Sequence, residues 1–422
     1  MNAQPPRRGR HLVTAGGAIL PGRNPFARLI AWRFHGVVDR IDAGLVTGSL
    51  EAHLPDGTTR VLGARAAGPS CIVYLRDWRA LVRLGLGGSV GWYRAWTLGE
   101  WDSPDPVPLF ALFMANARTL GGTARARGVN RWLGKTIQFL RKNSLSGARR
   151  NIAFHYDLGN DFYRLWLDDN LHYSSALFSD PSETLEVAQQ RKAEAVIKRL
   201  ALKDGDRLLE IGCGWGGLAQ VALEHASINY EGLTLSVEQQ AFAAERLARA
   251  GFAERARVEL TDYRDVAGTY DAIASVEMVE AVGQQYWPDY LAAIHRMLKP
   301  GGRAALQYIC IDDAIFDRYA DSIDFIQAYI FPGGLLLSES RFRAIAEAQG
   351  LIWQDQHNFG QHYAETLKQW RERFDAAVEA GRLPASFDAE FVRLWRYYLM
   401  YCEGGFRGGG IDVAQVTLTR AD

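Results

Sequence analysis

The sequence has 422 residues, of which 48% are hydrophobic, so it is long enough to bury a large core and to form two domains. Lysine plus arginine and aspartate plus glutamate number 48 each, so the net charge favours neither an acidic nor a basic partner. No apolar run reaches the roughly 18 residues that cross a bilayer, and the N-terminus lacks a signal-peptide core. The cysteines are far apart and fit neither a metal site nor a disulfide framework. We therefore expect a cytoplasmic protein whose cysteines are reduced; they are Cys71, Cys213, Cys310 and Cys402.

Basic residues gather in two stretches without acids. Met1 to Val38 holds six arginines, and Pro106 to Tyr156 holds nine Lys or Arg residues. Between positions 131 and 142 the apolar and basic residues fall on different helical faces. An anionic membrane surface attracts such a segment by about 1 kcal/mol per cation. A solvated helix between domains and a nucleic-acid-binding patch are the alternatives that charge alone leaves open.

The first third of the chain predicts an arm, a small domain and a linker. Residues 1–30 are a loose basic arm. Residues 31–105 form a small α+β domain, and residues 106–150 form a basic amphipathic helical linker. Within the small domain we expect strands at Leu45–Leu54 and Ser70–Leu75, a turn at Pro55–Gly57, and a helix at Trp78–Leu86 that ends at Gly87-Gly88.

From Asp204 onward strands and helices alternate, which predicts an α/β fold with a parallel sheet and crossover helices. A turn is expected at Lys299–Gly302. The expected strands are Arg207–Ile211, Asn229–Leu235, Val258–Thr261, Ala272–Val276, Ala304–Ile309, Ile352–Asn358 and Val413–Thr419. The expected helices between the earlier strands are Leu218–His225, Glu238–Ala250 and Tyr286–Leu298.

The first of these strands ends in the glycine-rich turn Gly212–Gly217, with the sequence GCGWGG. Glycines let the backbone turn sharply and approach a ligand that a Cβ would exclude, although dinucleotide sites use the same device. Glu210 precedes the turn, where it can hold the amino group of a methionine moiety. Asp262 and Tyr263 follow the third strand, where an acid can bind the adenine amino group and a ring can stack on the base. These features resemble the class I methyltransferase fold, which binds S-adenosylmethionine.

We assign the remaining cofactor contacts to residues that follow the same strands. Gly212 and Gly214 are expected to contact the methionine end of the cofactor. The second strand lacks the usual acid that grips the ribose, so Thr234 and Gln239 take the ribose-side contacts. The glycine turn has two alternative interpretations, a purely structural turn and a binding site for a nicotinamide cofactor. The later motifs do not suit a nicotinamide site.

Four further blocks occur in order along the chain. They resemble the cyclopropane-fatty-acyl-phospholipid synthase family over residues 150–400. The resemblance implies a Rossmann-like class I methyltransferase domain at 151–422, with a seven-stranded sheet, helices on both faces and a lipid-site insertion around 312–350. It also implies that the small α+β domain binds lipid. The blocks are NIAFHYDLGNDFYRLWLDDNLHYSSALF at Asn151–Phe178, VEMVEAVG at Val276–Gly283, YIFPGG at Tyr329–Gly334 and HNFGQHYAETLKQW at His357–Trp370.

The resemblance implies methyl or methylene transfer from S-adenosylmethionine to the double bond of an unsaturated phospholipid acyl chain. An alkene is a poor nucleophile, so it must be held against the methyl donor in a dry pocket. Loss of a proton from the new methyl group then closes a cyclopropane ring. Tyr173 and Ser174 are assigned to the cofactor site. Aromatic rings can stabilise the cations, and the candidates are Tyr173, Trp215, Tyr286 and Tyr308.

In this family the proton acceptor is a bound bicarbonate. The resemblance carries over Glu280, Tyr363 and the backbone amide of Ile309 as its ligands. Two positions depart from the family, because Ser175 stands where a cysteine is usual and Gln307 replaces a histidine. Both can still donate a hydrogen bond to an anion. An altered bicarbonate site therefore stays open, and so does redirected proton loss to a methyl-branched or methylenated product.

Three alternatives compete with this reading. They are a methyltransferase acting on a modified acyl chain such as a diene, a small-molecule N- or O-methyltransferase, and a catalytically inactive lipid-binding protein. The YIFPGG block and the basic segment argue against a small-molecule methyltransferase. The intact glycine turn and Glu280 argue against an inactive lipid-binding protein. We expect a cytoplasmic enzyme on the membrane surface, without a metal or a nucleic-acid partner, and leave a homodimer open.

Overall fold

A computed structural model describes residues 7–15, 31–121, 158–180 and 182–421. The described chain forms two compact units, each built from separate stretches of sequence. The first draws its described residues from Met1–Arg141, Asp312–Pro332 and Ala385–Ile411. The second draws them from Lys142–Ile311, Gly333–Pro384 and Asp412–Asp422. This division differs from a succession of domains along the chain, because two late segments join the first unit.

The first unit contains a four-stranded sheet in the order β2-β1-β3-β4. β1 (Ser49–His53) pairs antiparallel with β2 (Thr59–Gly63) and parallel with β3 (Ser70–Leu75), and β3 pairs antiparallel with β4 (Trp101–Asp102). Two helices, α2 (Ala31–Gly44) and α3 (Arg79–Thr97), complete an α+β arrangement. α3 continues past its predicted end, with a kink where Gly88 adopts a φ of 56°.

An apolar helix of the first unit, α4 (Val107–Ala115), packs against α16 (Ala389–Arg407). The two helices approach closely because α16 carries glycines. A Cβ on Gly404 would lie 2.4 Å from the Cβ of Phe110, and one on Gly408 would lie 2.5 Å from a backbone oxygen of α4. Residues 107–115 are therefore part of the core of this unit and not of a basic linker. The predicted linker from residue 122 to 150 lies outside the described residues.

The start of the predicted basic arm also belongs to the first unit. It contains α1 (Arg10–Ala15), and Arg8 Nε donates a 2.8 Å hydrogen bond to Ser386 Oγ. Residues 7–15 are thus held in place, while residues 1–6 and 16–30 lie outside the described chain. The other short helices of the unit are α5 (Ala117–Leu120), α13 (Asp313–Ala320) and the π-helix η6 (Ile326–Ile330).

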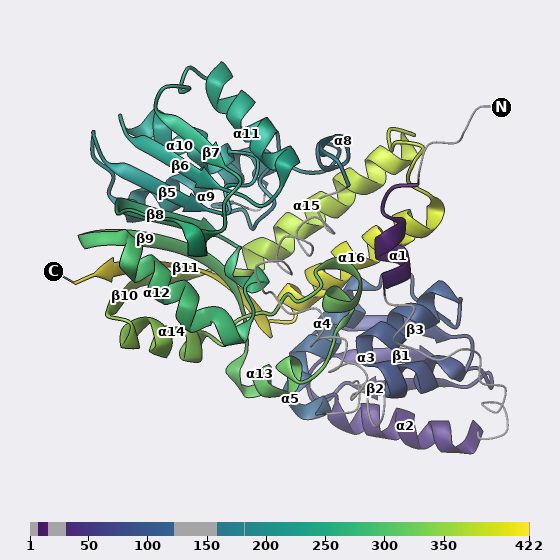
Figure 1. The fold of residues 1–422 in the computed structure, drawn as a ribbon. Coiled ribbons are helices and arrows are strands. Elements are labelled where there is room, and N and C mark those ends of the chain that lie inside the picture. The colour runs from purple at the N-terminus through teal and green to yellow at the C-terminus, as the bar shows by residue number, and fades with distance from the viewer. Residues whose placement is uncertain (1–6, 16–30, 122–157, 181, 422) are drawn as a thin grey trace. The chain divides into compact units, whose positions relative to one another are not determined.

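The second unit is built on a seven-stranded sheet in the order β10-β11-β9-β8-β5-β6-β7, with helices packed on it (Figure 1). Strands β5 to β9 run parallel, and β10 pairs antiparallel with β11. The strands are β5 (Arg207–Ile211), β6 (Asn229–Leu233), β7 (Ala256–Glu259), β8 (Tyr270–Val276), β9 (Leu298–Ile311), β10 (Leu351–Asn358) and β11 (Ile411–Arg420). The helices are α8 (Asn160–Tyr163), α9 (Leu185–Leu200), α10 (Gly217–His225), α11 (Val237–Arg249), α12 (Trp287–Met297), α14 (Glu339–Ala348) and α15 (Gly360–Glu379), with 3-10 turns η3 (Tyr263–Asp265), η4 (Val279–Ala281) and η5 (Gln284–Tyr286).

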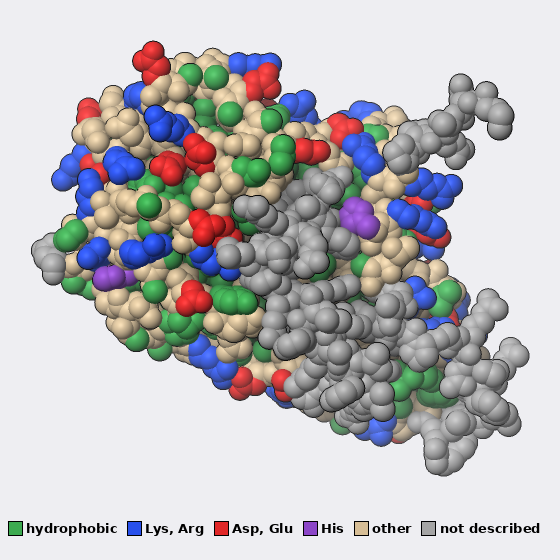
Figure 2. All heavy atoms as spheres, viewed as in Figure 1, with side chains coloured by type: hydrophobic (Ala, Val, Ile, Leu, Met, Phe, Trp, Pro, Cys, Tyr) green, Lys and Arg blue, Asp and Glu red, His purple; other side chains and the backbone are tan. Residues whose placement is uncertain are grey.

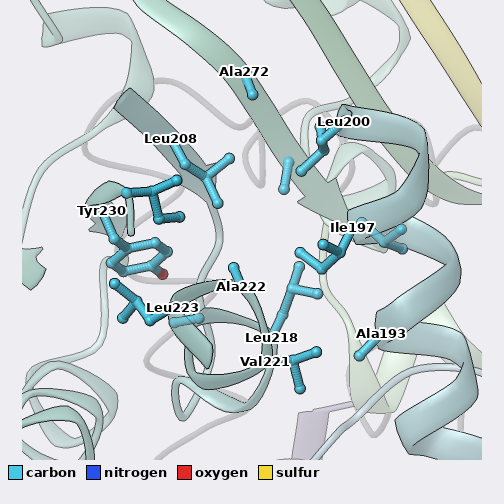
Figure 3. Close-up of a cluster of buried hydrophobic side chains, with 14 of the residues drawn as sticks. Ala193, Ile197, Leu200, Leu208, Leu218, Val221, Ala222, Leu223, Tyr230 and Ala272 are labelled. Carbon is cyan, nitrogen blue, oxygen red and sulfur yellow. The ribbon is translucent and has the colours of Figure 1, made fainter. Parts of the chain in front are cut away.

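A hydrophobic core joins α9 and α10 to the sheet (Figure 3). Ile197 of α9 and Leu218 and Ala222 of α10 gather with Leu208 of β5 and Ala272 of β8. Each large side chain buried in this way stabilises the fold by roughly 1.5–3 kcal/mol. The core holds β5 and β8 side by side at the point where the strand order reverses. In α/β sheets the loops that follow such a pair of strands form the ligand site.

The predicted α/β fold with a largely parallel sheet is confirmed, and each predicted strand of the second unit is present. One local prediction is wrong, because residues 299–302 lie within β9 rather than in a turn. Leu298 already pairs with Tyr270 of β8, ahead of a shift in register. No helix in the described part of the chain has the length and apolar character to cross a membrane. Figure 2 shows basic and acidic side chains mixed over the visible surface of this unit.

Candidate active site

The predicted site residues gather at the carboxyl edge of the parallel strands in the second unit. Glu210 lies at the end of β5, most of the other cofactor candidates follow β5, β6 and β7, and Glu280 follows β8. Tyr173 and Ser174 lie in the segment before α9. Gln307 and Ile309 lie near the end of β9, Tyr363 lies in the first turn of α15, and Ser175 lies in the segment before α9. Residues that are far apart in sequence thus reach one edge of the sheet.

The glycine turn leaves room beside its backbone. Gly212, Gly214 and Gly216 have φ values of 85°, 52° and 80°, which favour glycine. A Cβ on Gly212 would lie 2.9 Å from Met278 Cγ, and one on Gly216 would lie 3.1 Å from the Cβ of Ala243. A Cβ on Gly214 would meet no atom within 4 Å. Gly212 and Gly216 therefore have no room for a side chain, while Gly214 borders the open space that a ligand against the backbone requires.

Two buried groups of opposite charge lie next to this turn. Glu210, at the end of β5, accepts a 2.6 Å hydrogen bond from the Tyr230 hydroxyl, and burial raises its pKa to about 7. Lys192 of α9 donates a 2.8 Å hydrogen bond to Ser174 Oγ, and burial lowers its pKa to about 8. A buried carboxylate that loses solvation gains from a cationic ligand such as an amino group. The position of Glu210 therefore suits the methionine end of the cofactor.

The candidates for the ribose and the base already have partners within the chain. Thr234 Oγ1 donates a 2.9 Å hydrogen bond to Gln239 Oε1, and both side chains are buried. Both carboxylate oxygens of Asp262 accept hydrogen bonds from Arg264, at 2.8 and 2.6 Å. The Tyr263 ring packs edge-on against another tyrosine, with centroids 5.3 Å apart. An adenine amino group at Asp262 would share that carboxylate with the arginine.

Glu277, which is not among the residues predicted from the sequence, is the centre of a hydrogen-bonded cluster that includes three of them. Its Oε1 accepts hydrogen bonds from the Ser175 backbone N–H at 2.8 Å and from Gln307 Nε2 at 2.7 Å. Its Oε2 accepts one from the Tyr363 hydroxyl at 2.8 Å. Glu277 has a φ of 50°, a conformation that costs a residue with a Cβ about 1–2 kcal/mol. The available signal was a second acid in VEMVEAVG, directly after the predicted strand.

Glu280 lies beside this cluster with a different set of contacts. Its Oε1 accepts a 2.5 Å hydrogen bond from the Ile309 backbone N–H. Its Oε2 is buried and has no hydrogen-bond partner in the described structure. Burial and the nearby charge of Glu277 raise the pKa of Glu280 to about 8. Both acids keep part of their surface accessible. Glu280 therefore holds its proton at neutral pH.

The residues present do not fit a bound bicarbonate. The family resemblance implies that Glu280, Tyr363 and the Ile309 amide hold this ion, and it leaves an altered site with Ser175 and Gln307 open. Tyr363 and Gln307 instead donate to Glu277, and the Ile309 N–H donates to Glu280. The Ser175 hydroxyl donates to the adjacent backbone oxygen at 3.0 Å, so only its backbone N–H serves the cluster. Carboxylates of the chain occupy the donors that the ion would need.

Aromatic rings form a continuous cluster next to these acids. Tyr363 contacts Trp370, which contacts Tyr173, with ring centroids 5.9 and 5.4 Å apart. Tyr163 lies 5.7 Å from Tyr173 and 5.0 Å from Trp215. Two of the predicted cation-stabilising rings, Tyr173 and Trp215, thus belong to one cluster. The other two lie elsewhere: Tyr286 is in η5, and Tyr308 packs against Phe342 and Trp353 and donates to Glu339.

The seven-stranded sheet, the open face of Gly214 and the buried acid Glu210 fit S-adenosylmethionine and define a class I methyltransferase that depends on it. When bound, this cofactor supplies an electrophilic methyl group. The family can be named more narrowly, because residues 143–416 match the model of mycolic acid cyclopropane synthetase. The chain belongs to this family.

Relatives and solved structures agree with this assignment. The tuberculostearic acid methyltransferase UfaA1 of Mycobacterium tuberculosis is 38% identical over 394 residues, which cover 87% of this chain and 88% of that protein. The cyclopropane-fatty-acyl-phospholipid synthase of Escherichia coli K12 is 39% identical over 266 residues, which cover 63% and 66%. The crystal structure of mycolic acid cyclopropane synthase CmaA1 with SAH and CTAB is similar, with a TM-score of 0.61 and 32% identity. That similarity covers 64% of this chain and 98% of CmaA1.

Proposed function

We propose that this enzyme transfers a methyl group from S-adenosylmethionine to a double-bond carbon of an unsaturated phospholipid acyl chain, and that loss of a proton then closes a cyclopropane ring. The observation that carries the proposal is the half-buried pair of acids Glu277 and Glu280, which meets an aromatic cluster at the carboxyl edge of the sheet. Addition of a methyl group to an alkene needs both a surface that tolerates a cation and a proton acceptor.

The chain's own residues have distinct tasks in this reaction. Glu210 and the turn at Gly214 hold the methionine end of the cofactor, and Thr234, Gln239, Asp262 and Tyr263 hold its nucleoside. The rings of Tyr173 and Trp215 supply π-faces near the developing positive charge, where a cation gains about 0.5–2 kcal/mol. The same rings exclude water, which would otherwise capture the cation.

A second candidate is an open-chain product, methyl-branched or methylenated, from the same first step. It is supported by the match to UfaA1, a tuberculostearic acid methyltransferase, because that match spans 87% of the chain, against 63% for the Escherichia coli cyclopropane synthase. The departures at Ser175 and Gln307 and the presence of Glu277 also change the surroundings of the proton acceptor. A diene or other modified acyl chain would follow the same chemistry.

The substrate would be reached at a membrane surface. The acid-free stretch from Pro106 to Tyr156 offers nine cations for anionic lipid headgroups. Most of this stretch lies outside the described residues, and Arg118 within it pairs with Asp312 at 2.5 Å. We propose that the first unit and this stretch bring the enzyme to the lipid. We also propose that the enzyme can form a homodimer.

The test uses S-adenosylmethionine with a deuterated methyl group and vesicles of phosphatidylglycerol that carries one double bond in each acyl chain. Mass spectrometry of the recovered lipid should show an added carbon with deuterium. Proton NMR then distinguishes cyclopropane protons from the vinyl or methyl signals of an open-chain product. Vesicles with saturated acyl chains are the matched control and should gain no label. Unlabelled lipid from a protein that binds the cofactor would overturn the proposed function.

A further inference from the structure

The carboxylate of Glu277 is positioned by three donors from three separate parts of the second unit. The segment before α9 supplies the Ser175 N–H, β9 supplies Gln307 Nε2, and α15 supplies the Tyr363 hydroxyl, at 2.7–2.8 Å. The Glu277 N–H also donates to the Gln307 backbone oxygen at 2.7 Å. An ionised carboxylate can accept about four hydrogen bonds, two at each oxygen. Two of the three occupy Oε1, so Oε2 keeps capacity for a proton.

A chain of amides fixes the orientation of one of these donors. Gln307 Oε1 accepts a 3.0 Å hydrogen bond from Gln415 Nε2 of β11, and Gln415 Oε1 accepts a 3.2 Å hydrogen bond from Arg199 Nε of α9. Arginine can only donate, so it sets the orientation of the Gln415 amide, which sets that of Gln307. Gln307 consequently presents its NH2 group, and not its oxygen, to Glu277.

The two neighbouring acids differ in the protonation state that their surroundings favour. Burial raises the pKa of Glu277 above its ordinary value, and its three hydrogen-bond donors and the cation of Lys192 oppose that rise. Burial raises the pKa of Glu280 to about 8, and the charge of Glu277 adds to that rise, although the Ile309 N–H donates to Glu280 Oε1. Environments that separate two carboxyl groups in this way leave one ionised and the other protonated. The surroundings of Glu277 therefore favour the ionised carboxylate more than those of Glu280 do.

We propose that Glu277 is the catalytic base of the reaction, and that its carboxylate Oε2 takes the proton that the substrate loses, in place of a bound ion. The proposal rests on the proposed function. Once a methyl group has been added to one alkene carbon, the neighbouring carbon is cationic. A C–H bond of the new methyl group breaks, and its electron pair forms the C–C bond that closes the ring. The proton passes to Oε2, and the neutral Glu277 releases it to solvent before the next turnover.

The first test compares wild-type protein with Glu277→Gln in buffer freed of carbon dioxide. Glutamine keeps the shape of the side chain but removes the base. We expect turnover of unsaturated phospholipid to fall by at least about 100-fold, the lower range of a general base, with unchanged affinity for S-adenosylmethionine. Bicarbonate should leave the wild-type rate unchanged. A wild-type rate that rises with bicarbonate, or wild-type turnover in Glu277→Gln, would overturn the proposal.

A second test needs neither lipid nor turnover. Glycine tolerates the φ of 50° at this position, so Glu277→Gly should fold and leave the three donors around an empty place. Bicarbonate should then raise the thermal unfolding midpoint of Glu277→Gly. It should not raise that of wild type or of Asp355→Gly, a control that also replaces an acid with positive φ, at 54°. Equal stabilisation of wild type by bicarbonate would mean that an ion, and not Glu277, occupies these donors.

The two tests separate failure of the base from failure of the proposed function. A wild-type protein that methylates unsaturated lipid but depends on bicarbonate would overturn only the role of Glu277. A wild-type protein that binds S-adenosylmethionine and methylates no unsaturated lipid would overturn the proposed function, and the base role with it. In that second case the bicarbonate effect on Glu277→Gly should still appear, because the hydrogen bonds do not depend on the substrate.

Discussion

Replacing Glu280 with glutamine should remove a pH dependence from the stability of the protein. The pKa of this carboxyl group is raised from 4.5 to about 8 in the folded state. The folded protein therefore binds this proton more tightly than the unfolded chain does. By linkage, the wild type should lose stability as the pH rises from about 4.5 to about 8, and the loss should level off above that. An amide does not titrate, so the variant should lack this decline.

The size of the effect follows from the shift. At about 1.4 kcal/mol per pKa unit, a shift from 4.5 to about 8 amounts to about 5 kcal/mol above the upper value. Between pH 5 and pH 7 the corresponding change is about 2.5 kcal/mol. The glutamine oxygen can still accept the hydrogen bond from the Ile309 N–H, so the variant should fold.

Urea unfolding followed by tryptophan fluorescence, at half-unit steps from pH 5 to pH 8, measures this effect. The quantity of interest is the difference in unfolding free energy between Glu280→Gln and wild type, which cancels the titration of other groups. It should grow in favour of the variant by about 2–3 kcal/mol from pH 5 to pH 7. Glu347→Gln, on the exposed side of α14, is the control and should give a curve parallel to wild type. Parallel curves for Glu280→Gln as well would refute a buried, protonated Glu280.

Gly214→Ala should weaken S-adenosylmethionine binding by on the order of tenfold, about 1.4 kcal/mol, because its methyl group enters the open space beside the turn. Gly381→Ala, with a φ of 65° and equally open surroundings, is the control, and equal affinities in calorimetry would contradict the assignment. Binding to anionic vesicles should weaken with salt, because salt screens charges beyond about 10 Å at 0.1 M. It should weaken further when three arginines outside the described residues are replaced with glutamine. Vesicle binding that neither change weakens would indicate a solvated helix. These arginines are Arg125, Arg127 and Arg131. Ser175→Cys combined with Gln307→His should change the rate and leave the product cyclic. A wild type that gives branched lipid and a double variant that gives cyclic lipid would instead mean that this pair of positions directs proton loss.

The sequence was sufficient to predict the sheet of the second unit and its glycine turn, because both arise from local patterns. The apolar run Arg207–Ile211 and the glycines after it are enough to place a strand and a tight turn. The function of Glu277 was not accessible in this way. Its donors come from Ser175, Gln307 and Tyr363, which only the tertiary fold brings together. The family motif identified Glu280 instead, whose carboxylate accepts a hydrogen bond from the Ile309 amide.

The first unit also contains a helix pair that local sequence patterns do not predict. α4 reads as the start of a basic amphipathic segment, because charges follow it along the chain. Its partner α16 begins at Ala389, and the close approach depends on Gly404 and Gly408 of that helix. No sequence pattern within or near α4 predicts that it packs against α16. The division of the chain into arm, domain and linker therefore placed residues 107–115 outside the core to which they belong.

The pairing of α4 with α16 affects how the protein is made. A ribosome that adds about 5–20 residues per second needs about 15–55 s to pass from Ala115 to Ala389. For most of that interval the apolar sequence VPLFALFMA of α4, once it has emerged from the ribosome, lacks the helix that covers it. A nascent chain in this state is a substrate for chaperones and is prone to aggregate. Yield in a heterologous host should therefore respond to chaperone supply and to slower translation, more than to changes at the active site.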